Sequence, residues 1–219
     1  MIAADDKNKG FTLIELLVAM AVAAIVMAAI VSAYQVQVKG KLTQDITIDM
    51  QQTARAALQI MASDIQLAGC DPEGSANAGF DTADSGNIEV SMDIDDDSST
   101  GLPDGDTEAP GEQVEYRLSG DQLQRDIGDG NGFRTIAQNV DALDFVYLDS
   151  DGATTSNRSD IRRVEMTIIV RSDRDPWLSD YVNNKTYQNK QGNDIYGPAN
   201  DESPRLCLTK TVFCPNMGL

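Results

Sequence analysis

Histidine is absent from this chain of 219 residues, which also has only three cysteines and one tryptophan. Without histidine there is no Ser-His-Asp or Cys-His catalysis, no imidazole metal ligand and no ordinary switch near neutral pH. Basic side chains are scarce too, because 17 Lys and Arg residues stand against 35 Asp and Glu residues, for a formal net charge of -18. This charge argues against binding to a nucleic-acid backbone, which needs a positive surface.

The apolar residues concentrate near the N-terminus. Residues 16–31 contain no polar side chain, and residues 11–34 extend this block with three polar interruptions. As a helix the longer block would span roughly 36 Å, and a bilayer core is about 30 Å thick. Three interpretations compete: a buried core helix, a secretory signal cleaved near the small residues 31–33, and a retained membrane helix. Lysines flank both ends, so the positive-inside rule leaves the orientation of the block open.

Glu15 lies near the start of this block. An ionised carboxylate in the bilayer costs about 2.5–3.5 kcal/mol on the most lenient scale, although a helix dipole offsets a little of this near a helix N-terminus. Physical chemistry leaves two interpretations open. Glu15 is either a functional residue that needs a positive partner or an interfacial residue whose carboxylate reaches water.

Residues 9–16, which read KGFTLIEL, resemble the processing signal of type IV prepilins and of type II secretion pseudopilins. The resemblance implies that a prepilin peptidase cuts between Gly10 and Phe11 on the cytoplasmic side and methylates the Phe11 amine. It implies that Glu15 neutralises the N-terminal amine of a neighbouring subunit during assembly. It also implies a single pass through the bacterial inner membrane, with the N-terminus in the cytoplasm.

Four later stretches resemble PilW-like minor pilins, which are related to the J-type pseudopilins of type II secretion: residues 63–72, 139–149, 160–168 and 205–212. The resemblance implies a minor pilin that primes pilus assembly or sits at the tip of the extracellular pilus. The implied partners are other pilins and minor pilins, the prepilin peptidase, the inner-membrane assembly platform, a tip adhesin, and the lipid bilayer before assembly. A J-type minor pseudopilin is the nearer alternative, and a secreted calcium-dependent adhesin or binding module is the more distant one.

No enzyme motif stands out in the sequence. A P-loop, a glycine-rich dinucleotide motif after a strand and a nucleophile elbow are all missing. We therefore expect a structural protein and not an enzyme.

Beyond the apolar block the sequence becomes amphipathic, and apolar residues recur every three or four positions, which predicts a helix. Gly69 offers a C-cap and Pro72 prevents continuation, so we expect one helix from Phe11 to Ala68, with Gly40 as a weak point. The predicted buried stripe contains Leu42, Ile46, Met50, Ala54, Ala57, Leu58, Met61, Ile65, Leu67 and Ala68.

After Gly69, short β-prone segments alternate with turn residues, which predicts strands. Ser119, Gly120 and Asp121 indicate a hairpin turn between two of them. In the segment 161–171, apolar residues alternate with more polar ones, so one face is expected to be largely polar. The predicted strands cover residues 87–94, 113–118, 122–126, 140–148, 161–171 and 206–213.

Together with the resemblance, these elements predict an α+β, type IV pilin-like fold, in which a long N-terminal helix packs on an antiparallel β-sheet with long loops. The segment 173–204 is expected to be an irregular loop anchored by aromatic residues. The expected parts are a cleaved leader at residues 1–10, a membrane-spanning and filament-core half-helix at 11–34, an amphipathic half-helix at 35–69, and a β domain at 70–219.

Fourteen acids and no Lys or Arg lie between residues 71 and 115. Such density is typical of a solvated, mobile loop. The alternative is a calcium site, since Asp93, Asp95 and Asp97 resemble the first half of an EF-hand loop and Asp104 stands near its end. The glycine and the bidentate glutamate of an EF-hand are both missing, so a true EF-hand is not expected. No other cofactor is expected.

The chain has three cysteines, Cys70, Cys207 and Cys214. Because this number is odd, an oxidising compartment allows at most one disulfide within the chain. A continuous strand from Cys207 to Cys214 would separate those two residues by about 23 Å, whereas a disulfide needs Cα atoms within about 7 Å. A bridge from Cys70 to a tail cysteine and three free thiols both stay open.

Overall fold

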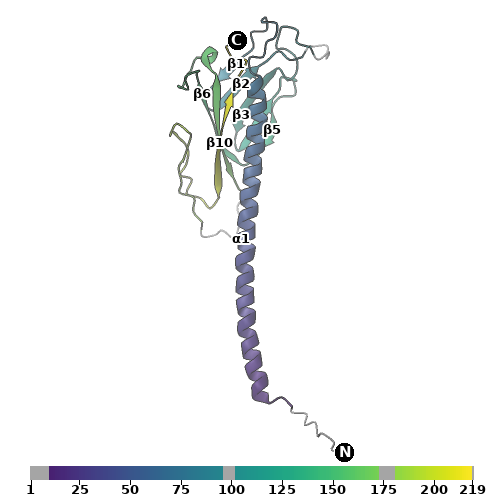
Figure 1. The fold of residues 1–219 in the computed structure, drawn as a ribbon, viewed down its shortest axis with the longest axis vertical. Helices are drawn as coiled ribbons and strands as arrows, with labels where there is room; N and C mark the ends of the chain where they lie inside the picture. The colour runs from purple at the N-terminus through teal and green to yellow at the C-terminus, as the bar shows by residue number, and fades with distance from the viewer. Residues whose placement is uncertain (1–9, 96–101, 173–180, 219) are drawn as a thin grey trace, which may run out of the picture. The chain divides into compact units, whose positions relative to one another are not determined.

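The computed structural model describes residues 10–95, 102–172 and 181–218 (Figure 1). The chain falls into two compact units, Met1–Asp45 and Ile46–Leu219. Helix α1, Leu13–Leu67, runs through both of them. The predicted helix from Phe11 to Ala68 is therefore confirmed, and Gly40 does not interrupt it.

In the first unit, α1 leaves its apolar side chains uncovered. Every described residue from Gly10 to Lys41 is exposed. The most apolar 18-residue window of α1 has a mean hydropathy of 2.7 and none of it is buried, so the helix is long and apolar enough to cross a membrane. The interpretation as a buried core helix is wrong, because no described part of the chain covers these side chains.

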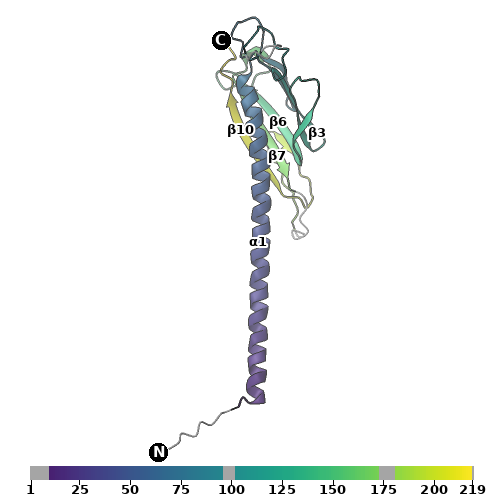
Figure 2. The same ribbon diagram turned by 90° about the vertical axis from the view of Figure 1, so that its right-hand side faces the viewer.

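In the second unit, the described residues form three antiparallel sheets (Figure 2). The first sheet contains, in spatial order, β1 (Phe80–Ala83), β2 (Asn87–Ser91), β3 (Gln113–Ser119), β4 (Gln122–Asp126) and β5 (Arg134–Ala137). The second contains β10 (Arg205–Phe213), β7 (Arg163–Arg171) and β6 (Val140–Leu148). The third is a ribbon of β8 (Tyr187–Gln188) and β9 (Asp194–Tyr196), and a 3₁₀ turn, η1, spans Arg158–Asp160. One long helix with antiparallel sheets confirms the predicted α+β class.

All six predicted strands are present, and β4 and β6 have the predicted bounds. The hairpin turn is confirmed, because Ser119 pairs with Gln122 and Gly120 has a φ of 64°. A glycine tolerates this left-handed conformation without steric cost. The sequence pattern does not predict β1, β5, β8 and β9, since strands of four residues or fewer are too short to show alternation.

The core of the second unit lies between the last turns of α1 and the strands of the two larger sheets. Most of the predicted stripe is buried there, namely Met50, Ala54, Ala57, Leu58, Met61, Ile65 and Ala68. Leu67 is 41% exposed, so its assignment to the stripe is wrong. It stands two positions after Ile65, about 200° further around the helix, and therefore faces away from the core.

The end of α1 confirms the predicted C-cap. Gly69 has a φ of 77°, and the Cys70 N–H donates to the Leu67 carbonyl at 2.9 Å. The side-chain amide of Asn216 donates to the carbonyl of Gln66 at 3.3 Å. A Cβ at Gly69 would lie 2.7 Å from the sulfur of Met217, so a glycine in this left-handed conformation lets the C-terminal residues close over the helix end without strain.

Strand β7 is buried on both faces, including the face that was expected to be largely polar. Glu165, Thr167 and Ile169 on that face are as buried as the inward residues between them. The segment 181–204, expected to be irregular, covers this face with the β8–β9 ribbon and its flanks. Lys190 Nζ and Gln191 Nε2 donate to the Glu165 carboxylate at 2.6 and 2.5 Å, respectively.

Further contacts attach the same segment. Asn189 on the ribbon turn donates to Asp144 on β6 at 2.9 Å. Of the predicted aromatic anchors, Tyr187 and Tyr196 pair across the ribbon with ring centroids 6.4 Å apart, Tyr181 is half-buried, and Trp177 lies outside the described residues.

Candidate processing and assembly site

The predicted processing site lies immediately before α1. Gly10 and Phe11 precede the first helical residue, and the Phe11 side chain is 91% exposed. Proteases act on exposed, non-helical peptide bonds, so the Gly10–Phe11 bond is accessible to one in this chain. Cleavage and methylation at this bond stay predictions.

Thr12 and Glu15 form a capping box on the first turn of α1. The Thr12 backbone N–H and hydroxyl both donate to Glu15 Oε2, each at 2.8 Å. The Glu15 N–H donates to Thr12 Oγ1 at 3.3 Å. These bonds satisfy donors that lack partners at every helix start, and they keep the carboxylate where the helix dipole favours negative charge. The spacing T-x-x-E in residues 12–15 is the sequence signal for this box, which was not among the predicted features.

Glu112, in the acidic segment, is a fully buried acceptor of backbone amides. It accepts from the N–H groups of Ile94 and Asp95 at 2.7 and 2.9 Å and from that of Ala109 at 3.2 Å. Asp71 similarly accepts from the N–H groups of residues 74, 75 and 77. The prediction of a solvated loop is therefore wrong for Glu112, whose carboxylate organises the loop around itself.

The four predicted calcium ligands are only partly brought together. The buried carboxylate of Asp93 accepts from the backbone N–H groups of Asp104 and Gly105, each at 3.2 Å. Asp95 is the last residue described before the gap, and Asp97 lies outside the described residues. In the described part of the chain, no group of three or more carboxylates or thiols could hold a metal ion. Calcium binding stays a prediction, which calorimetric titration of the purified protein with Ca²⁺ tests.

The three cysteines are free thiols in this structure. Strand β10 pairs with β7 in continuous register from Arg205 to Phe213. The chain is therefore extended between Cys207, near the start of β10, and Cys214, which directly follows its end, and this is the arrangement in which the two residues lie too far apart for a disulfide. Burial raises the pKa of the Cys214 thiol to about 12, which keeps it protonated and unreactive. A bridge that involves Cys70 stays a prediction.

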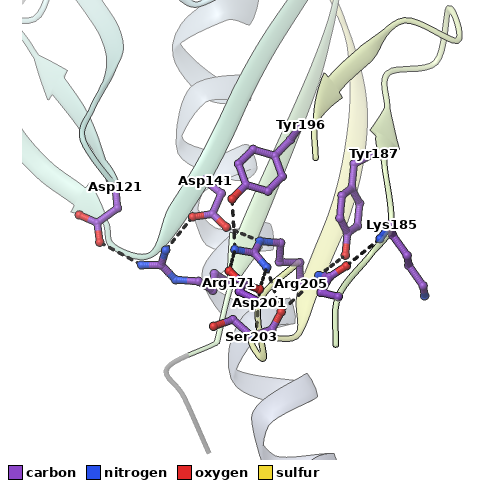
Figure 3. Close-up of polar contacts among 10 residues, drawn as sticks. Asp121, Asp141, Arg171, Lys185, Tyr187, Tyr196, Asp201, Ser203 and Arg205 are labelled. Atoms are coloured by element: carbon purple, nitrogen blue, oxygen red, sulfur yellow. Dashed lines mark hydrogen bonds and ion pairs between the residues drawn. The ribbon is translucent and has the colours of Figure 1, made fainter. Parts of the chain in front are cut away.

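A buried charge cluster attaches the segment 181–204 to the second sheet (Figure 3). Arg205 on β10 has a side chain only 1% exposed and donates to Asp201 at 2.5 and 2.6 Å. It also donates to one oxygen of Asp141 on β6, and Arg171 on β7 donates to the other at 3.0 Å. The hydrogen bonds from Arg205 hold the pKa of Asp201 below its ordinary value. No local pattern in the sequence predicts this cluster, since Arg205 and Asp141 stand far apart along the chain.

A second network joins α1 to the first sheet. Asp64, predicted to lie on a polar face of the helix, accepts from Arg125 on β4 at 2.9 Å and from the hydroxyl of Tyr116 on β3. Burial, reinforced by the Asp64 carboxylate, raises the pKa of Tyr116 above its ordinary range, so the hydroxyl stays a donor. Both networks hold the second unit together.

Known proteins resemble this chain in its N-terminal motif and in its fold. Residues 5–31 match the family model described as the prokaryotic N-terminal methylation motif. The fold is similar to the solved structure of the type IV-like pilin TTHA1219 from Thermus thermophilus, with a TM-score of 0.51 and 13% sequence identity over 77% of this chain and 98% of that chain. No curated protein matches the sequence. The motif confirms the predicted prepilin signal, and the structural likeness confirms a type IV pilin-like fold.

Proposed function

We propose that this chain, which carries a prepilin methylation motif in front of a type IV pilin-like fold, is a minor pilin that primes the assembly of a type IV pilus or sits at its tip. One observation carries the proposal. The Gly10–Phe11 signal directly precedes the exposed apolar segment of α1, residues 11–34, which has a single carboxylate, Glu15, held at the start of the helix. A structural role in assembly uses all of these features.

The exposed helix of the first unit needs an apolar environment, because each Å² of apolar surface left in water costs about 25 cal/mol. Before assembly the inner-membrane bilayer supplies that environment, with the N-terminus in the cytoplasm, where the prepilin peptidase acts. The assembly platform then moves the helix into a fibre, where helices of other pilins replace the lipid.

The Glu15 carboxylate is the charged group in the apolar segment that would pair with a neighbouring subunit during this transfer. In an apolar surrounding a carboxylate is favourable only beside a donor or a positive charge. The N-terminal amine of a neighbouring subunit, created by leader removal, is such a charge. Pairing of the two groups would set the axial position of one subunit against the next.

The second unit encloses its own core and faces outward in the proposed fibre. From residue 70 onward the chain contains 29 acids and 12 basic residues, so this unit presents a negative surface. We propose that it contacts other minor pilins and, at the tip, an adhesin on the outside of the cell.

Intact mass and N-terminal sequencing of the chain purified from its own host test the proposal first. The expected mature protein begins with N-methylated Phe11. A mature N-terminus at Tyr34 would instead indicate ordinary secretion after signal cleavage and would rule out a pilin.

Substitution of Glu15 tests the assembly step. Glu15→Ala is expected to be processed normally but to be at least tenfold depleted in sheared fibres, measured by quantitative immunoblot against the cell-associated chain. Asp45→Ala, which removes an exposed carboxylate from the same helix, is the matched control and should incorporate normally. Equal incorporation of both variants and the wild type would contradict the role of Glu15.

Pilus and secretion pseudopilus are separated by deletion of the gene. If the chain is a minor pilin of a type IV pilus, the deletion is expected to reduce the number of surface pili and to leave type II secretion intact. A secretion defect with normal pili would reassign the chain to the J-type pseudopilins. Neighbouring genes provide an independent check, since minor pilin genes and secretion genes lie in different operons.

A further inference from the structure

Strand β10 forms one edge of the second sheet, and in the described part of the chain no strand pairs with its outer side (Figure 2). Its pairing with β7 runs in unbroken register over nine residues, which is about 30 Å at 3.3 Å per residue. The strand contains no proline, and its register shows no bulge. Natural proteins rarely leave so long and regular an edge open, because it is a template for pairing with another chain.

The other edges of the two larger sheets are short or engaged. β1 and β5 have four residues each, and the pairing of each with its neighbour shifts in register. On the outer side of β6, the Phe145 N–H donates to the Ser85 carbonyl at 2.8 Å. Short strands, bulges and covering loops are the usual protections of an edge, and β10 has none of them among the described residues.

The two ends of β10 show which of its backbone groups point outward. The Cys214 N–H donates to the Arg162 carbonyl at 2.9 Å, and the Pro204 carbonyl accepts from the Ser172 N–H at 3.0 Å. Even-numbered residues therefore direct their backbone groups toward β7, and odd-numbered residues direct theirs to the open edge, because the two kinds of pair alternate in an antiparallel ladder.

The outward groups of β10 belong to Arg205, Cys207, Thr209, Thr211 and Phe213. Within residues 10–95, 102–172 and 181–218, no protein group bonds to the backbone N–H or C=O of these residues. The edge thus presents a row of alternating donors and acceptors that an extended chain could satisfy.

Positive charge lies beside this edge, although the unit as a whole is acidic. Lys210 on β10 donates to the neutral side chain of Gln59 on α1 at 2.7 Å. Arg55 is exposed and stands one turn before Gln59 on the same side of the helix. Among the residues that the structure describes, neither cation has an acidic partner. A strand with acidic side chains would complement both of them.

Resting on the proposed function, we propose that the open edge of β10 binds an extended acidic segment of another pilin subunit, which adds a strand to the second sheet. Backbone hydrogen bonds would provide the affinity, and acidic side chains beside Lys210 and Arg55 would select the partner. A second copy of this chain fits less well, because its own β10 contains Arg205 and Lys210 and no acid. The added strand would join two outward units independently of the helices in the fibre core.

A defined probe tests the edge on the full chain in detergent. The probe is a peptide of nine residues in which Val and Asp alternate, and its control has Lys in place of Asp. Amide exchange is followed by nuclear magnetic resonance with and without each peptide. The acidic peptide is expected to slow exchange at Cys207, Thr209 and Thr211 and to leave the even-numbered residues, which are bonded to β7, unchanged. The basic peptide is expected to change none of these rates.

Proline at position 209 separates the edge from the rest of the strand. The Thr209 N–H points outward, so Thr209→Pro removes one open donor and keeps the hydrogen bonds to β7. Thr209→Ala is the matched control, because both variants lose the hydroxyl that contacts Thr167 at 3.0 Å and only the alanine keeps the N–H. Thr209→Pro is expected to lose most of the peptide binding, and Thr209→Ala is expected to bind almost as the wild type does.

Lys210→Glu provides a second test that leaves the backbone intact. It is expected to weaken binding of the acidic peptide several-fold, because like charges then lie side by side. Lys185→Glu, at an exposed lysine of another segment, is the matched control and should bind as the wild type does.

The partner is identified in the host of the chain by replacing Phe213, which is 56% exposed, with photoreactive benzoylphenylalanine. After irradiation, mass spectrometry is expected to find position 213 joined to an extended acidic segment of a different pilin. A product joined only to a second copy of the chain, or only to a protein that is not a pilin, would overturn the inference.

The peptide experiment can overturn it independently. Equal protection by the acidic and basic peptides, no protection by either, or wild-type binding by Thr209→Pro or Lys210→Glu would each do so. Failure of the proposed function is recognised separately, because Glu15→Ala would then incorporate as well as the wild type, whereas the peptide measurements need no fibre.

Discussion

The two units differ in the burial of their apolar side chains. In the first unit, Leu13 is 77% exposed and its apolar neighbours are similarly uncovered, whereas Ile65, further along the same helix, is completely buried by strands. Both residues are apolar and belong to the same helix. The difference teaches that an apolar helix does not determine its own burial, which the rest of the chain provides in the second unit and a bilayer or other subunits must provide in the first.

The two units also differ in how they satisfy their carboxylates. The first unit has one carboxylate in its apolar segment, and that carboxylate is hydrogen-bonded by its own helical turn. The second unit buries several carboxylates, and it satisfies them with backbone amides around Glu112 and with arginines around Asp141. Substitutions in the two units should therefore have separable effects.

The largest effect is expected from Arg205→Met. It leaves Asp141, whose side chain is 6% exposed, without its buried partner, and removal of one member of a buried ion pair costs about 3–5 kcal/mol. Thermal or denaturant unfolding of the full chain in detergent measures the loss. Arg134→Met is the matched control, because Arg134 is 55% exposed in its pair with Asp129 and should lose about 1 kcal/mol or less. Equal losses would show that the Arg205 cluster does not hold the second unit.

The second largest expected effect is the loss of stability when a buried isoleucine of α1 is substituted, compared with a half-exposed one. Ile65→Ala is expected to destabilise the second unit by about 2–5 kcal/mol, because it opens a cavity in the core. Ile48→Ala, at a side chain that is half exposed, should cost less than half as much. Urea unfolding with an unchanged slope would assign the difference to stability. Similar midpoints for both variants would contradict the burial pattern.

A charge introduced into the first unit should weaken membrane insertion without changing the stability of the second unit. Ala24→Lys is expected to weaken membrane insertion by about 2.5–3.5 kcal/mol, which lowers the fraction that stays in alkali-washed membranes. The unfolding midpoint of the second unit should not change, since Ala24 is exposed and belongs to the other unit. Ala24→Leu is the size control and should remain in the membrane. A lower midpoint in the Lys variant would show that the units are energetically coupled.

The smallest expected effect is a pH dependence in the second unit. Burial alone would raise the pKa of Glu165, but the hydrogen bonds from Lys190 and Gln191 outweigh it and lower the pKa below the ordinary value of 4.5. A lowered folded-state pKa stabilises the fold fully above the unfolded value, and this contribution is lost as the pH falls through the folded value. Stability should therefore decline below about pH 4.5.

Lys190→Met isolates this contribution, because it removes the cation that contacts Glu165. Its unfolding midpoint is expected to change less between pH 5 and pH 3 than that of the wild type. Lys185→Met, at an exposed lysine on the same segment, is the control and should keep the wild-type slope. A Lys190 variant with the wild-type slope would show that Glu165 does not contribute.

The sequence was sufficient where the information is local. The prepilin signal around Gly10, Phe11 and Glu15, the periodicity of α1 and the hairpin at Gly120 each depend on residues within a few positions of one another. The prepilin signal was therefore predictable from the sequence, and T-x-x-E at residues 12–15 also indicates the capping box.

What the sequence did not predict depends on partners far apart in the chain. Alternation in β7 indicates two different faces, but it cannot show that Lys190 and Gln191 will cover the polar one. Arg205 meets Asp141 only after the second sheet has formed. The buried role of Glu112 was also hidden, because a run of acids has the composition of a solvated loop whether or not one of them turns inward.

Strand β7 has a consequence for the dynamics of the second unit. It is hydrogen-bonded to a neighbour along each edge and covered on each face, so no small local opening brings its amides into contact with water. Hydrogens that exchange only through complete opening report the global free energy of unfolding. The amides of residues 164–170 are thus expected to exchange last in deuterium oxide, and their exchange rate measures the global free energy of unfolding of the second unit.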